Sequence, residues 1–145
     1  METAHLIGGI AVLATNLVAG AWGAVAWLRQ VPSVAFWTLL RIAQAAVVAQ
    51  VLLGAVLLLS GRESPDGLHY VYGLLPLVVT LLAEAIRAGA AERELVGVDF
   101  DSLPRERQRL IALAIVRRET GIMAASALIV LFLALRAAGT SGELF

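Results

Sequence analysis

Two histidines are the residues of this sequence whose type and spacing most directly suggest chemistry. His5 and His69 are each followed four residues later by a glycine, Gly9 and Gly73. In a helix that turns by about 100° per residue, a residue and its fourth neighbour share a face. Polar and small side chains of lipid-embedded helices face the bundle interior. We therefore expect both imidazoles to point inward, at similar depth, on two parallel helices.

The histidine–glycine pattern resembles the bis-histidine site of small four-helix membrane cytochromes, which hold b-type haem. The resemblance implies that His5 and His69 are axial ligands of a haem b iron, and that Gly9 and Gly73 leave room for the macrocycle edge. Two other interpretations stay open. The imidazoles hydrogen-bond to water and loop carbonyls at the interface, or they bind another metal with nearby acids, Glu2, Glu63 or Asp66. We expect no metal beyond the haem iron.

A second set of polar residues gathers at the opposite ends of the hydrophobic stretches. Glu84 precedes Arg87 by three residues, and a carboxylate at a membrane boundary normally pairs with an arginine. We expect it to pair with Arg87, or with Arg41 or Arg117 on other helices. A functional interpretation is a proton or ion relay, or an anchor for a lipid headgroup or quinone. The structural one, which we favour, is a salt-bridge cluster that fixes helix register.

Further polar residues are expected inside the apolar stretches. Asn16 and Thr80 each follow a histidine by eleven residues, and Gln50 is expected near mid-membrane beside Asn16. Such side chains form interhelical hydrogen bonds of about 0.6 kcal/mol, so we interpret them as packing and register devices. The predicted intramembrane polar network comprises Asn16, Arg41, Gln44, Gln50, Thr80, Glu84, Arg87, Arg117, Arg118 and Glu119.

The elements that position these residues follow from the composition. Of 145 residues, 60% are hydrophobic and 15% charged, with a mean hydropathy of +0.87. A soluble domain is about 45–50% apolar and about 25% charged, so a water-soluble fold is excluded. The chain has no cysteine and a net charge of zero. These values exclude disulfides and thiolate metal sites, and they imply no nucleic-acid partner.

Four stretches are long enough to cross a bilayer. A spanning helix needs about 20 predominantly apolar residues, and residues about 5–28, 35–60, 68–88 and 120–138 meet this condition. We therefore predict an all-α fold, an antiparallel four-helix bundle that forms a single transmembrane domain over residues 1–145.

The longest connection is expected to be helical in part. Residues 99–107 include the sequence DSLPRER, in which Ser102 or Asp101 is expected to cap a helix with Pro104 in its first turn. That helix is expected to continue into the fourth span, reaching about 36 residues and about 54 Å. Residues about 89–119 would then form a helical hairpin that projects from the membrane.

Arginine placement predicts the orientation. Nine arginines lie in or beside the connections between spans 1 and 2 and between spans 3 and 4, whereas the other side has Arg62 and Arg136. Positively charged connections face the cytoplasm. We therefore expect a multi-pass protein of the cell inner (plasma) membrane, with a cytoplasmic hairpin and both termini on the outer face.

Catalytic motifs are absent from the sequence: it contains no phosphate-loop, dinucleotide, zinc-protease or serine-hydrolase pattern. We expect a non-enzymatic protein, an accessory or structural subunit of a membrane complex. Its expected partners are the lipid bilayer and other membrane subunits or further copies of the chain. The alternatives are a haem b electron carrier that uses His5 and His69, and a small proton-coupled transporter that uses Glu84.

The whole chain resembles small, uncharacterised four-span membrane proteins of GC-rich bacteria. The segments that carry this resemblance are GLHYVYGLLPLVVTLLAEAIR and IVRRETGIMAASALIVL. It implies a bacterial inner-membrane protein and assigns no catalytic residue.

Overall fold

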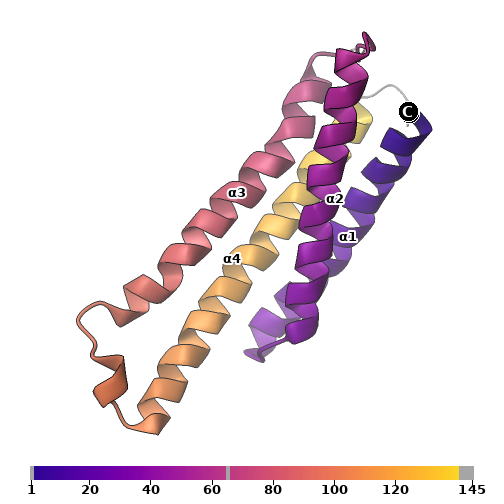
Figure 1. The fold of residues 1–145 in the computed structure, drawn as a ribbon. Coiled ribbons are helices and arrows are strands. Elements are labelled where there is room, and N and C mark those ends of the chain that lie inside the picture. Colours follow the sequence, from indigo (N-terminus) through magenta and orange to yellow (C-terminus); the bar gives the residue numbers. More distant parts are fainter. Residues whose placement is uncertain (1, 65, 141–145) are drawn as a thin grey trace.

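The chain folds into four long helices joined by short connections (Figure 1). The computed structural model describes residues 2–64 and 66–140. Its helices are α1 (Glu2–Arg29), α2 (Val34–Leu59), α3 (Leu68–Leu95) and α4 (Arg105–Gly139), with a 3-10 turn, η1 (Phe100–Ser102), before α4. All four α-helices are long and apolar enough to cross a membrane. The predicted all-helical architecture with four candidate spans is therefore confirmed.

The hairpin of α3 and α4 extends beyond the other two helices (Figure 1). α4 is continuous over 35 residues, which corresponds to about 52 Å at about 1.5 Å per residue. The expectation of one long helix running into the fourth span is thus confirmed. The predicted third span ended near residue 88, but α3 continues to Leu95, so both sides of the projecting hairpin are helical.

The start of α4 differs from the sequence-based expectation. Neither Asp101 nor Ser102 caps it, because both lie in η1, where the Ser102 hydroxyl donates to the carbonyl of Asp99 at 2.8 Å. Pro104 occupies the cap position and makes no side-chain cap hydrogen bond. The extra 3-10 turn therefore uses the capping side chain locally and delays the helix until Arg105.

The start of α2 is fixed by a serine cap. Ser33 has an extended backbone, and its hydroxyl accepts a hydrogen bond from the amide of Phe36 at 3.2 Å. The same hydroxyl accepts from the indole nitrogen of Trp22 at 2.9 Å. α1 ends one residue before Gln30, which has a positive φ of 56°. The α1–α2 turn is therefore short and anchored to α1.

Close helix packing is made possible by glycines on α1. A Cβ atom at Gly20 would lie 2.6 Å from Leu128 Cδ2 on α4, and one at Gly23 would collide with Phe36 of α2 and Ala124 of α4. These two glycines therefore lie at contacts between helices. α4 packs along both α1 and α3 and α1 packs along α2, whereas α2 and α3 pack little on each other.

The core is not distributed evenly along the bundle. We call the end that holds His5, His69 and the α2–α3 connection the histidine end, and the opposite end the hairpin end. The largest buried cluster lies toward the hairpin end: Ala19, Phe36, Leu40, Ala43, Ala83, Met123, Ala124 and Ala127. A smaller one follows it toward the histidine end: Val12, Val47 and Val130. Packing therefore becomes sparser toward the two histidines.

Candidate functional site

A cavity of about 430 Å³ lies at the histidine end. Residues from all four helices and from the α2–α3 connection line it. Much of its space results from small side chains, namely Gly9, Gly54, Ala55, Gly73, Ala134, Ala137 and Ala138. Its volume is within the range of about 300–1,000 Å³ that is usual for small-molecule and cofactor sites.

The two histidines face each other at this cavity. The centres of the His5 and His69 rings are 6.1 Å apart, and the ring planes are inclined by 63°. At a metal–imidazole nitrogen distance of about 2.0–2.1 Å, two rings on opposite sides of one ion have centres about 6.4 Å apart. The spacing of the rings therefore matches that of two imidazoles that share a metal ion.

The hydrogen bond of His69 determines which ring nitrogen is available. His69 Nδ1 lies 3.0 Å from the carbonyl oxygen of Ala137 on α4. Because a carbonyl can only accept, Nδ1 carries the proton and Nε2 of the neutral ring keeps its lone pair. A backbone carbonyl on the second nitrogen is the usual partner of a metal-binding histidine, since it fixes the tautomer and the ring orientation.

His5 is held by a glutamine of α2. The amide nitrogen Nε2 of Gln50 donates to the backbone carbonyl of His5 at 2.9 Å and lies 3.3 Å from His5 Nε2. The carbonyl fixes the orientation of the amide, so the imidazole Nε2 accepts and holds no proton. In their neutral forms both rings therefore keep the lone pair on Nε2, and that of His5 accepts from Gln50.

Two glycines allow this arrangement around His5. A Cβ atom at Gly8 would collide with Oε1 of Gln50, and one at Gly54 would lie 3.3 Å from Cε1 of His5. Gly8 therefore admits the glutamine and Gly54 admits the imidazole. The glycines predicted from the sequence also border the cavity: a Cβ at Gly9 would lie 3.5 Å from Gln50 Nε2, and one at Gly73 would meet no atom within 4 Å.

Two histidine rings alone favour a metal that is already held by other donor atoms within a cofactor. Within residues 2–64 and 66–140, no group of three or more histidine, cysteine or acidic side chains is placed to hold a metal ion. Glu63 and Asp66 therefore join no such group, and the side chain of Glu2 lies outside the described part. A metal bound through His5 and His69 needs more donors, and a macrocycle supplies four in a plane.

The mouth of the cavity carries polar groups. The hydroxyl of Tyr70 accepts a hydrogen bond from the amide of Ser64 at 2.7 Å, which ties the α2–α3 connection to α3. Tyr72 lines the cavity, and the guanidinium of Arg136 lies 5.5 Å from the centre of its ring. Arg62 also lines the cavity. The apolar chamber therefore ends in tyrosine hydroxyls and cationic groups.

The second predicted set of residues forms an ion-pair network centred on Glu84. Its Oε1 accepts from Arg41 Nη1 at 2.5 Å and from Gln44 Nε2 at 2.8 Å, and its Oε2 accepts from Arg87 Nε at 2.8 Å. Arg87 also approaches Glu119 of α4 at 3.6 Å. Two of the three arginines proposed as partners are thus present. The network joins α2 and α3, which otherwise pack little on each other.

The other predicted network residues lie apart from Glu84. Arg117 stacks over Trp27 with 5.9 Å between guanidinium carbon and ring centre, and Arg118 pairs with Glu94 at 2.7 Å. Asn16 is buried and donates to the carbonyl of Val12, and Thr80 donates to that of Pro76. These two side chains therefore bond to their own helices.

Sequence reasoning missed the groups that hold the two imidazoles. The sequence analysis did not connect Gln50 or Gly54 with His5. Gln50 and Gly54 are four residues apart on α2 and therefore share a face of that helix. That spacing was a usable signal. The contact of His69 with the Ala137 carbonyl could not be foreseen, because every residue has the same backbone acceptor.

No family model, curated protein or solved structure matches the chain.

We predict that Glu84→Gln lowers the free energy of unfolding by about 1–2 kcal/mol, because Arg41 and Arg87 lose the carboxylate that they share in a partly buried site. Thermal unfolding in mild detergent, followed by circular dichroism, measures the change. Glu92→Gln is the matched control, since Glu92 is exposed and forms no ion pair in the described part of the chain. Equal effects of the two substitutions would contradict a stabilising role of the network.

Proposed function

We propose that the protein is a non-enzymatic membrane electron carrier that binds haem b between His5 and His69. The observation that carries the proposal is the 6.1 Å separation of the two ring centres at the wall of a cavity of about 430 Å³. Two imidazoles that in their neutral forms keep a lone pair on Nε2 would be a suitable donor set for haem iron.

The residues around the histidines have defined roles in this proposal. The Ala137 carbonyl orients His69, and Gln50 positions the backbone that carries His5. Gly73 leaves open space beside His69, where the edge of a flat macrocycle needs room. Bound haem supplies a one-electron redox centre. With His5 and His69 both holding the group, the chain would leave no ligand position for a substrate, and this donor set favours electron transfer over catalysis.

An electron carrier needs a donor and an acceptor. We therefore also propose that the protein is an accessory subunit of a membrane complex. Its partners would be other membrane subunits or further copies of the chain. The projecting hairpin of α3 and α4 gives such partners a charged surface outside the apolar layer.

The role of a proton-coupled transporter is less well supported, because both oxygens of Glu84 are already engaged by cationic or amide donors.

We predict that the wild-type protein, expressed with haem available and purified in mild detergent, shows a haem Soret band. His5→Ala and His69→Ala should each remove at least about nine-tenths of the bound haem, because one axial ligand is lost. Tyr72→Phe is the control, since Tyr72 lines the same cavity and supplies no ring nitrogen. Absorption spectra of the oxidised and reduced proteins measure the effect.

Two outcomes would overturn the haem proposal. One is a folded wild-type protein that stays colourless when haem is supplied. The other is a haem spectrum that neither histidine substitution changes. Circular dichroism of each variant establishes that it is folded before the spectra are compared.

The orientation proposed for the chain places the hairpin end in the cytoplasm, since nine of the eleven arginines lie toward that end. Because the chain has no cysteine, single cysteines can report it. We predict that a membrane-impermeant maleimide added to intact cells labels Glu63→Cys and leaves Ser102→Cys unlabelled until the cells are opened. The reverse labelling pattern would show the opposite orientation.

A further inference from the structure

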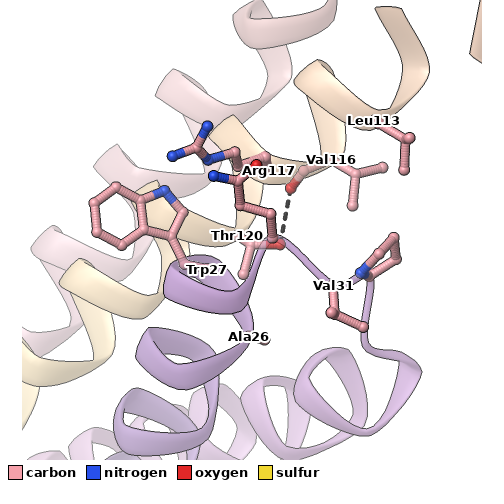
Figure 2. Close-up of a pocket in the computed structure, with 9 residues that line it drawn as sticks. Ala26, Trp27, Val31, Leu113, Val116, Arg117 and Thr120 are labelled. Carbon is pink, nitrogen blue, oxygen red and sulfur yellow. Dashed lines mark hydrogen bonds between the residues drawn. The ribbon is translucent and has the colours of Figure 1, made fainter. Parts of the chain in front are cut away.

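A small groove lies between the α1–α2 connection and α4, where α1 has ended and α4 continues. Its lining residues are Ala26, Trp27, Gln30, Val31, Pro32, Leu113, Val116, Arg117 and Thr120. Figure 2 shows Arg117 and Trp27 together on one side of this groove, with Leu113 and Val31 on the other. The groove is therefore amphipathic, with a cationic edge beside an apolar one.

The cationic edge is available for an anion. The Arg117 guanidinium stacks on Trp27 and has no carboxylate within 4.0 Å in the described part of the chain. Other arginines toward the hairpin end do form ion pairs. Arg118 pairs with Glu94, and both Arg41 and Arg87 pair with Glu84. Stacking on an aromatic ring leaves the edge N–H groups of a guanidinium available to donate to phosphate oxygens.

The position of Trp27 is built into the packing of α4. A Cβ atom at Gly121 would lie 2.7 Å from the indole nitrogen of Trp27, so only a glycine lets the ring lie against this turn of α4. Thr120 donates its hydroxyl hydrogen to the carbonyl of Val116 at 2.8 Å (Figure 2). The stacked pair is therefore held in place by the helix beneath it.

The apolar edge is exposed at the end of a membrane-crossing helix. Val31 is 57% exposed and Leu113 is 38% exposed. Both lie across the groove from Trp27, a residue type that favours the level of lipid headgroups. The groove has room for only about 10 Å³, so an occupant lies across its open side, where it meets both a cation and an apolar wall.

We propose that this groove binds the headgroup of an anionic phospholipid. The phosphate oxygens accept from the Arg117 guanidinium, and the first carbons of the acyl chains lie against Val31 and Leu113. Basic pockets between membrane helices bind anionic headgroups in this way. The site is independent of the histidine cavity, which lies at the opposite end of the bundle.

The test is native mass spectrometry of the full chain in mild detergent, titrated with phosphatidylglycerol or with phosphatidylcholine. We expect the wild-type protein to retain phosphatidylglycerol preferentially. Arg117→Gln should weaken retention about fivefold, the effect of removing one cation near an anionic lipid surface. Arg118→Gln changes net charge equally but removes a cation that is already paired with Glu94, and it should retain lipid like the wild type.

Three results would overturn the proposal: equal retention of the two lipids by the wild type, equal loss in Arg117→Gln and Arg118→Gln, or unchanged retention in Arg117→Gln. Arg117→Lys guards against a loss of structure, since it keeps the positive charge and should restore most of the retention. If millimolar inorganic phosphate displaces the bound lipid, the groove is a general phosphate site and the assignment to a lipid is wrong.

Discussion

All four α-helices are long and apolar enough to cross a membrane, and within hydrocarbon a polar side chain has to find its partners in the protein. The arrangement of this molecule follows from that constraint at two levels. At the histidine end, the Ala137 carbonyl holds His69 and Gln50 holds His5. At the hairpin end, Glu84 gathers three donors from two helices. These hydrogen bonds also fix the orientation of the side chains that make them.

The helices pack more tightly toward the hairpin end than toward the histidine end. The glycines of α1 admit Leu128 and Phe36 and allow α1, α2 and α4 to approach closely toward the hairpin end. Toward the histidine end, the interior is lined in part by glycine and alanine, which leave space where large side chains would fill it. The tightly packed part thus supplies rigidity, and the sparsely packed part supplies a chamber with two imidazoles at its wall.

The number of helices could be predicted because apolar length is a property of single segments. The start of α4 could not, because η1 is a local alternative that uses Ser102 in its own turn. The sequence alone left three arginines as possible partners of Glu84, because all three were expected near the same membrane boundary. The structure distinguishes them, because Arg117 stacks on Trp27 instead. The partners of His5 and His69 depend on interhelical register, which no single segment encodes.

The most direct measurement of a shared iron between His5 and His69 is the electron paramagnetic resonance spectrum of the oxidised, haem-supplied wild-type protein. Two imidazole ligands give a six-coordinate, low-spin ferric iron, and we predict that signal. A wild-type spectrum that contains only high-spin ferric haem would show that at most one histidine binds the iron, and it would contradict the proposed site.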